Sequence, residues 1–389
     1  MADSSTPKPQ NTKSSAMAAA ADQNPVKFGV IGCARIARKL IRAISLSPTT
    51  TLAAIGSRSL SKAQKFLSEN RIWLGEATTS TMTVKVYGSY EGVVEDEMVE
   101  AVYLPVPTRM HVKWAVAAAE RGKHVLVEKP VGVDVGDVEV MVEACRVNGV
   151  QFMDGTMWLH HPRTRRLRGL LDDQLLFGDL RMIHSSSTFR DANEEFFKDN
   201  IRVKAELDAL GALGDAGWYC IGAILWANNY KLPSTVTALP KVTRNDEGVI
   251  LDCGASFHWE GEDVKVAIFH CSFLCHESMD LTMSGSKGTI TLRDFIIPYQ
   301  EHSASFDFSS DVKFVDLHIG WSSTPKRVEV STELPQEALM VQEFGRLVHN
   351  IKVLGSSPDE KWPGISTKTQ LLLDAVKKSI DAGFKTITV

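Results

Sequence analysis

The sequence predicts an α/β protein in which a parallel, doubly wound sheet is followed by a second, α+β domain with a large, mostly antiparallel sheet. Up to Gly155, short apolar runs alternate with helical patterns, as strands and helices do around a parallel sheet. Beyond that point the periodicity changes, and residues 236–330 form short runs in which apolar and polar side chains alternate. We therefore place the first domain at residues 25–155 and the second at residues 156–389, whose two closing helices, near 336–354 and 366–382, can pack back on the first domain.

Composition and charge limit the classes of function. The chain has 389 residues, enough for two domains, and its formal net charge is −4 at pH 7. Such a charge offers no basic surface for nucleic acid or for an anionic membrane. The six cysteines lie mostly within apolar runs, and no apolar window is long enough to span a membrane. We expect a cytoplasmic protein that binds neither nucleic acid nor a membrane.

Residues 1–24 are rich in Ser, Ala, Thr, Lys and Gln and show no apolar periodicity. That composition is typical of a disordered tail, so we exclude this segment from the fold. An organellar transit peptide is the alternative interpretation. The segment has no arginine and no amphipathic pattern, which disfavours that alternative.

The first ordered segment is a strand, a tight turn and a helix. Residues 26–31 are an apolar run, Gly32 begins the turn, and a helical pattern follows. Dinucleotide-binding Rossmann domains have G-x-G-x-x-G/A at this point, because small residues let the backbone approach the pyrophosphate at the amino end of the helix. Here the second and third small positions are Ala34 and Ala37. The residues expected to contact the cofactor are Gly32, Cys33, Ala34, Arg35, Ile36 and Ala37.

The end of the second strand, at Gly56, indicates which nicotinamide cofactor is bound. A carboxylate there would bind the ribose hydroxyls of NAD, whereas an arginine accommodates the additional phosphate of NADP. The chain has Ser57 and Arg58 at this position, Lys62 lies one turn into the next helix, and no acid is present. Arg58 can bond a phosphate through two N–H groups and stack on adenine. We therefore expect NADP rather than NAD; a solvated basic turn is the alternative.

An apolar run at residues 125–127 predicts a buried central strand, and it ends abruptly in Glu128, Lys129 and Pro130. In an open α/β sheet, ligands bind outside the carboxyl ends of the strands. We therefore expect Glu128 and Lys129 to face the bound ligand. A solvated Glu–Lys pair that closes a strand is the alternative.

A second polar pair lies on a helix of small residues at 211–223. Asp215 and Tyr219 are separated by four residues, so on a helix both side chains project from one face. A buried acid and a buried phenol need partners, and Lys129 can provide one. The alternative is a structural Asp–Tyr pair at the boundary between the domains.

Two other polar clusters have simpler interpretations. The four arginines within residues 163–168 are interpreted as the solvated face of an amphipathic helix rather than as a phosphate site. His270, Cys271, Cys275 and His276 have the side chains of zinc ligands. Strand alternation places the two cysteines on one face and the two histidines on the other, so we expect no metal site.

Several segments together resemble the family named for glucose-fructose oxidoreductase, inositol dehydrogenase and a rhizopine-catabolism protein (Gfo/Idh/MocA), over nearly the whole ordered chain. The segments are the glycine turn at 32–37, Gly56-Ser57-Arg58, Pro105-Val106-Pro107-Thr108 with His111, Glu128-Lys129-Pro130, and Asp215 with Tyr219. Tyr219, where other members have histidine, is similar to the branch that contains glucose-fructose oxidoreductase, dimeric dihydrodiol dehydrogenase and NADP-dependent xylose dehydrogenase.

The resemblance implies roles for individual residues. It places Lys129 beside the nicotinamide and in contact with substrate, and Pro130 in a fixed turn that is often cis. Pro105, Thr108 and His111 would line the nicotinamide side of the cofactor site. Trp158 and Phe189 correspond by spacing to aromatic residues of the dihydrodiol enzymes, so these two and His111 are expected in the substrate pocket. The large sheet would form a homodimer interface.

These residues imply an NADP-dependent oxidoreductase that moves hydride between nicotinamide and a CH–OH carbon of a sugar, polyol or cyclic dihydrodiol. Tyr219 is expected to carry the proton, since Lys129 would lower its pKa, and Asp215 would orient the substrate hydroxyl or the lysine. A non-catalytic NADP-binding regulator of the same fold is the alternative. A third possibility is an enzyme whose bound NADP shuttles between two substrates.

Overall fold

The structure is a computed structural model that describes residues 24–74, 83–189, 194–261, 265–316 and 320–389. The tail expected at residues 1–24 lies, apart from Asn24, outside the described residues. Within the described ranges, no helix is both long enough and apolar enough to cross a membrane.

The first domain is built on a six-stranded sheet in the order β3-β2-β1-β4-β5-β6, with every pair of neighbours parallel. This is the strand order of a Rossmann fold, and the sequence predicted that fold for this domain. The strands β1, β2, β4, β5 and β6 are almost wholly buried because helices cover both faces, which explains their continuous apolar runs. The strands are β1 (Val26–Ile31), β2 (Thr50–Gly56), β3 (Lys85–Tyr87), β4 (Ala101–Leu104), β5 (His124–Val127) and β6 (Phe152–Asp154).

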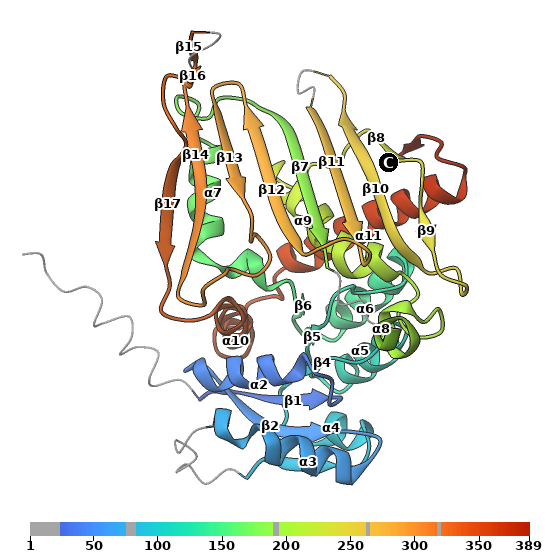
Figure 1. The fold of residues 1–389 in the computed structure, drawn as a ribbon. Coiled ribbons are helices and arrows are strands. Elements are labelled where there is room, and N and C mark those ends of the chain that lie inside the picture. The colour runs from blue at the N-terminus through green and yellow to red at the C-terminus, as the bar shows by residue number, and fades with distance from the viewer. Residues whose placement is uncertain (1–23, 75–82, 190–193, 262–264, 317–319) are drawn as a thin grey trace, which may run out of the picture.

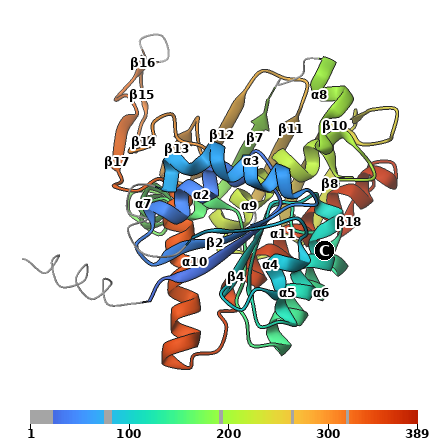
Figure 2. The ribbon, with the colours of Figure 1, turned by 90° about the horizontal axis from the view of Figure 1, so that it is seen from below.

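The helices of the first domain lie on the two faces of this sheet (Figure 2). They are α2 (Ala37–Leu46), α3 (Leu60–Asn70), α4 (Glu91–Glu95), α5 (His111–Ala119) and α6 (Val135–Val147), with 3₁₀ turns at Arg71–Leu74 and Thr108–Met110. The side chain of Ser59 accepts a hydrogen bond from the amide of Lys62 and so caps α3. The side chain of Asp134 caps α6 in the same way.

The second domain contains a 10-stranded sheet in the order β17-β14-β13-β12-β7-β11-β10-β8-β18, with β9 paired to β10. The sheet is mostly antiparallel, as predicted, but β7 and β11 are parallel neighbours at its centre. Its strands are β7 (Leu180–Thr188), β8 (Thr235–Ala238), β9 (Thr243–Arg244), β10 (Ile250–Trp259), β11 (Lys265–Ser272), β12 (Ser278–Gly285), β13 (Gly288–Leu292), β14 (Ser303–Ser310), β17 (Lys326–Ser331) and β18 (Ile387–Thr388). A separate hairpin is formed by β15 (Phe314–Asp316) and β16 (Gly320–Trp321).

Some helices of the second domain lie on one face of the large sheet, and others lie between that sheet and the first domain (Figure 1). They are α7 (Pro162–Leu171), α8 (Glu194–Asp199), α9 (Trp218–Ala227), α10 (Gln336–Leu354) and α11 (Lys361–Asp381), with 3₁₀ turns at Met157–His160 and Ile201–Val203. The closing helices pack back on the first domain, α10 against α2 and α11 against α6 and β6. The hydroxyl of Ser366 on α11 donates to Asp154 at the end of β6.

Arg163 on α7 differs from the sequence interpretation. We expected the arginines at 163–168 on a solvated face, and Arg165 and Arg166 are indeed exposed. Arg163 is 2% exposed instead, and its guanidinium lies 2.5 Å from the carboxylate of Asp294. It also donates to the backbone carbonyl of Ser305 at 3.1 Å. The interpretation is wrong for Arg163 because this side chain points toward the strands rather than toward water.

The buried ion pair between Arg163 and Asp294 predicts a large loss of stability when Arg163 is truncated. We expect Arg163→Ala to lower the free energy of unfolding by about 3–5 kcal/mol, because the Asp294 carboxylate would stay buried without a partner. Chemical denaturation followed by tryptophan fluorescence would measure this change. Arg166→Ala, on the same helix but exposed, is the control and should change the value by less than about 0.5 kcal/mol. Equal effects of the two substitutions would contradict the burial argument.

Candidate active site

The strand order locates a ligand site at the carboxyl edge of the parallel sheet. The order reverses between β1 and β4, and ligands of open α/β sheets bind at such a point. Gly32 follows β1 there with a φ of 117°, a conformation that favours glycine. A Cβ atom on Gly32 would lie 3.1 Å from Val106 and 3.4 Å from the carbonyl oxygen of Pro105, in the turn after β4. Glycine therefore allows this turn to pack closely against the turn after β4.

The turn between β1 and α2 offers donors to an anion. Within the described residues, the amide N–H groups of residues 33–36 have no hydrogen-bond acceptor. The first turn of α2 contains no acidic residue. Free amides together with the positive end of a helix dipole form an environment that favours phosphate. The turn therefore fits the pyrophosphate of a dinucleotide, as the sequence predicted.

Basic side chains lie at the end of β2, beside this turn. Ser57 is buried. Burial of the Cys33 thiol raises its pKa, whereas the charge of Lys62 and a hydrogen bond with Ser57 lower it. Arg58 lies near the hydroxyl of Tyr90, whose pKa is raised by burial and lowered in part by the Arg58 charge. Arg58 and Lys62 are exposed and have no ion-pair partner in the described part of the chain. Both are available to an additional phosphate.

The turn after β4 is held by contacts that sequence reasoning did not foresee. The hydroxyl of Thr108 donates to the carboxylate of Asp208, so a residue expected near the nicotinamide also binds the second domain. His111 is 1% exposed, and each of its ring nitrogens lies 2.9 Å from a backbone carbonyl, those of Val106 and Val131. His111 therefore does not line a substrate pocket, contrary to expectation. Its ring joins the turn after β4 to the turn after β5.

Lys129 lies directly after β5, and its peptide bond to Pro130 is cis. Its ammonium group lies 2.5 Å from one carboxylate oxygen of Asp215 and 3.1 Å from the backbone carbonyl of the same residue. The other carboxylate oxygen of Asp215 lies 2.9 Å from Nε of Arg202. Burial opposes ionisation of Asp215, but the charges of Arg202 and Lys129 hold its pKa well below the usual value. The carboxylate is therefore ionised between two cations.

Tyr219 approaches Lys129 from a helix that begins with a π turn. Residues Leu213–Gly217 form that wider turn, and α9 continues from Trp218. Such turns occur often at functional sites. Asp215 and Tyr219 consequently reach the same lysine, whose ammonium group lies 4.6 Å from the centre of the Tyr219 ring. The hydroxyl of Tyr219 lies 3.6 Å from the sulfur of Met157, a weak acceptor.

The pKa of Tyr219 is the main electrostatic difference from expectation. We expected Lys129 to lower it, but the pKa lies well above the usual value of a tyrosine. Burial is the largest cause, and the negative charges of Glu128 and Asp215 act in the same direction. The positive charge of Lys129 is paired with Asp215 and lies over the ring rather than at the hydroxyl. In this state the phenol keeps its proton.

Glu128 is held inside the site rather than exposed to solvent. The hydroxyl of Tyr103, a wholly buried residue of β4, donates to its carboxylate, and the backbone amide of Lys129 lies 3.3 Å from the second oxygen. Burial raises the pKa of Glu128, although the Tyr103 hydrogen bond and the Lys129 charge oppose the rise. A Cβ atom on Gly155 would meet the same carboxylate at 3.1 Å.

The two aromatic residues expected in the substrate pocket have different surroundings. Trp158 is 3% exposed and packs edge-on against Trp226 and Phe295, so it belongs to the core of the second domain and not to a pocket wall. Phe189 is partly buried against Phe196 and Phe273, at the end of β7 that faces the first domain.

Sequence reasoning missed three residues of this site: Tyr103, Met157 and Arg202. Tyr103 could have been found, because a phenol inside a buried central strand requires a hydrogen-bond partner. Arg202 lies in a short 3₁₀ turn without periodicity or motif, and only the tertiary structure brings it to Asp215. Met157 likewise gave no signal in the sequence.

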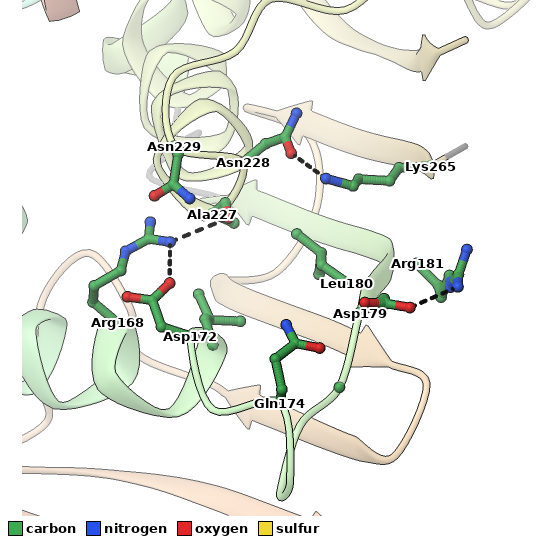
Figure 3. A pocket seen from close by; sticks show the side chains of 12 residues that line it. Arg168, Asp172, Gln174, Asp179, Leu180, Arg181, Ala227, Asn228, Asn229 and Lys265 are labelled. Atoms are coloured by element: carbon green, nitrogen blue, oxygen red, sulfur yellow. Dashed lines mark hydrogen bonds and ion pairs between the residues drawn. The ribbon is translucent and has the colours of Figure 1, made fainter. Parts of the chain in front are cut away.

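A pocket with a cavity volume of about 510 Å³ lies at the end of β7 that is away from the parallel sheet. Its charged side chains bond to one another or to a helix end (Figure 3). Arg181 lies 2.9 Å from Asp179, Arg168 lies 3.7 Å from Asp172, and the ammonium of Lys265 lies 2.8 Å from Asn228. None of the residues expected in the active site lines this pocket, so we do not assign chemistry to it.

Comparison with known proteins finds relatives among reductases and dehydrogenases. A relative from Actinomadura kijaniata, named dTDP-3,4-didehydro-2,6-dideoxy-alpha-D-glucose 3-reductase, is 34% identical over 204 residues, which are 52% of this chain and 56% of the relative. D-xylose 1-dehydrogenase (NADP(+)) 2 from Haloferax volcanii is 33% identical over 50% of this chain and 55% of its own length. The alignments therefore span about half the length of these relatives.

Two further similarities extend over most of the chain. Human trans-1,2-dihydrobenzene-1,2-diol dehydrogenase is 25% identical over 80% of this chain and 91% of its own length. The crystal structure of KijD10, a 3-ketoreductase from Actinomadura kijaniata in complex with NADP and TDP-benzene, superposes with a TM-score of 0.74 at 24% identity, over 91% of this chain and 98% of the other. The latter similarity establishes the fold alone.

Both domains match one family. Residues 26–156 match its N-terminal domain, described as an oxidoreductase family with an NAD-binding Rossmann fold. Residues 164–291 match the GFO/IDH/MocA C-terminal domain. The matches cover the turn at Gly32, the Lys129 turn and the helix that contains Asp215 and Tyr219. The chain therefore belongs to the Gfo/Idh/MocA oxidoreductase family.

Proposed function

We propose that the protein is an NADP-dependent oxidoreductase that interconverts a CH–OH group and a carbonyl group in a sugar, polyol or cyclic dihydrodiol. The main support for this proposal is that Lys129, Asp215 and Tyr219 contact one another at the carboxyl edge of the parallel sheet. A nucleotide-binding domain alone does not need a buried lysine and a protonated phenol at that place. The names of the relatives, which are sugar reductases, a xylose dehydrogenase and a dihydrodiol dehydrogenase, agree with this substrate range.

The choice of NADP rests on the end of β2. Arg58 and Lys62 are exposed there and Ser57 lies beside them, with no carboxylate to bind the ribose hydroxyls of NAD. The KijD10 complex with NADP and the NADP-linked xylose dehydrogenase support the same choice. When bound, NADP supplies or accepts a hydride at its nicotinamide ring.

The protein's own side chains would transfer the proton and orient the substrate. In reduction, the Tyr219 hydroxyl would give its proton to the carbonyl oxygen of the substrate, and the phenolate would then regain a proton from solvent. Lys129 has three N–H groups; two bond to Asp215, and the third can hold the substrate oxygen. Asp215 fixes the ammonium group in place. The raised pKa of Tyr219 favours reduction at neutral pH, since the acid is already protonated.

A regulator that binds NADP without catalysis remains the alternative, and an enzyme that retains its NADP between two substrates is the third possibility. The regulator would bind NADPH and turn over no substrate. The retaining enzyme would be purified with nicotinamide absorbance that dialysis does not remove.

We also propose a homodimer formed through the large sheet and a reducing compartment such as the cytoplasm. Among the described residues, no helix covers the second face of that sheet, which presents short side chains such as Thr235, Ser256 and Thr282. All six cysteines are free thiols. Sedimentation of the purified protein would test the dimer.

Removal of the Tyr219 hydroxyl tests the proton carrier. We expect Tyr219→Phe to lower kcat/KM by about 10²- to 10⁴-fold, because the ring packing survives and only the proton donor is lost. NADPH affinity, measured by fluorescence, should be unchanged and serves as the control. Retention of full activity would show that another group carries the proton.

The direction of the Tyr219 pKa shift predicts the pH dependence of the oxidation reaction. Because the folded pKa lies above the usual value, the phenolate that would act as base is scarce at neutral pH. We expect kcat/KM for oxidation to rise about tenfold per pH unit up to pH ~10 without a plateau. Steady-state rates between pH 7 and 10 measure this. A plateau below pH 8 would contradict it.

Substitution of Arg58 tests the cofactor assignment. We expect Arg58→Ala to weaken NADP binding by about 10- to 100-fold, the range for loss of a hydrogen bond to a charged group. NAD binding should change little because NAD lacks the additional phosphate. Titration of both cofactors by calorimetry distinguishes these outcomes, and an equal loss for NAD would refute the proposed contact.

A further inference from the structure

Arg202 is a charged residue of the site whose hydrogen-bonding capacity is only partly used. Its Nε group lies 2.9 Å from Asp215, and its backbone amide donates to the side chain of Asn200 at 3.0 Å. Within the described residues, neither terminal guanidinium nitrogen has a partner. A guanidinium has five N–H donors in a fixed planar arrangement, so four of them remain for a ligand.

Arg202 is much more exposed than the three other groups of the site. Tyr219 is 9% exposed, the side chains of Lys129 and Asp215 are 10% and 8% exposed, and the Arg202 side chain is 37% exposed. Arg202 therefore lies on the solvent side of the three inner groups. Only the Asp215 carboxylate separates its guanidinium from the Lys129 ammonium, a separation that one monosaccharide can span.

The backbone around Arg202 is fixed from both domains. In the second domain, Asn245 donates to the carbonyl of Val203 at 2.8 Å, and the amide of Ala205 donates to Glu247 at 3.0 Å. In the first domain, the Arg109 side chain donates to the carbonyl of Ala205 at 3.0 Å. A guanidinium on so well-anchored a segment loses little conformational freedom on binding.

Each carboxylate near Arg202 is also engaged by another group. Asp215 is shared with Lys129, so it neutralises only part of the charge of the two cations. Glu128 accepts hydrogen bonds from Tyr103 and from the amide of Lys129, and Asp208 accepts one from the hydroxyl of Thr108. Carboxylate and phosphate groups match the planar N–H edge of a guanidinium through two parallel hydrogen bonds.

We propose that Arg202 binds an oxyanion on the substrate, so that the preferred substrates are acidic carbohydrates with a carboxylate or phosphate substituent near the reacting carbon. This inference rests on the proposed oxidoreductase function and specifies its substrate class. Arg202 acts as a specificity residue: its Nε atom orients Asp215, and its terminal nitrogens bind the substrate anion.

The test compares matched acidic and neutral sugars. Wild-type protein with NADP is assayed with D-glucose, D-glucuronate and D-glucose 6-phosphate, the two acids distinguishing a carboxylate from a phosphate. We expect KM for at least one acid to be at least about tenfold below that for glucose. In Arg202→Gln, KM for that acid should rise about 10- to 100-fold, kcat/KM for glucose should change much less, and Arg202→Lys should restore part of the affinity.

A control variant separates direct binding from general electrostatics. Lys204→Gln removes a positive charge two residues away, one that is paired with Glu247 at 3.1 Å, and should leave KM for the acid unchanged. Equal KM values for acidic and neutral sugars in the wild type would overturn the inference. So would an equal loss of kcat for both sugars in Arg202→Gln, because that result indicates a role in orienting Asp215 alone.

Binding measurements keep this inference distinct from the proposed function. Failure to bind NADPH would refute the function itself. If NADPH binds but no sugar is turned over, calorimetric titration of the NADPH complex with D-glucuronate, D-glucose 6-phosphate and D-glucose decides the matter. Acid-selective binding that disappears in Arg202→Gln supports the inference, and binding of none or all of the three sugars alike overturns it.

Discussion

The carboxylate of Asp215, held between the cations of Lys129 and Arg202, is the interaction on which the site depends. Lys129 comes from the turn after a strand of the first domain, whereas Asp215 and Arg202 belong to the second. A buried carboxylate is costly unless it is paired and hydrogen-bonded, so the two domains must meet in the arrangement that satisfies it. The ion group thus joins the domains at the place where ligand and cofactor sites adjoin.

Other contacts maintain the same junction without charges in the site. The hydroxyl of Thr108 binds Asp208 across the domain boundary, and α10 and α11 return from the second domain to pack on the first. His111 joins the turns that follow β4 and β5. Because the Lys129 turn and the Arg202 segment are each held from two sides, little rearrangement of them is needed to orient a ligand.

The residues around Tyr219 decide whether its phenol is protonated. Proximity to an ammonium would ordinarily lower the pKa of a phenol, but here the ammonium is paired with Asp215 and lies over the ring. Burial and two carboxylates then dominate, so the phenol stays protonated and is suited to donate a proton to a carbonyl.

The sequence by itself determined the order of strands and helices, the glycine turn at Gly32, the basic end of β2 and the pairing of Lys129 with Asp215 and Tyr219, because each depends on local patterns or on a known motif. Only the tertiary structure decided the rest. Arg202, Tyr103 and Met157 reach the site across long sequence separations, which no periodicity encodes. The structure also buries three residues that were expected to face solvent or substrate, namely Arg163, His111 and Trp158. The sequence could not show this, because the environment of a side chain depends on the elements packed against it.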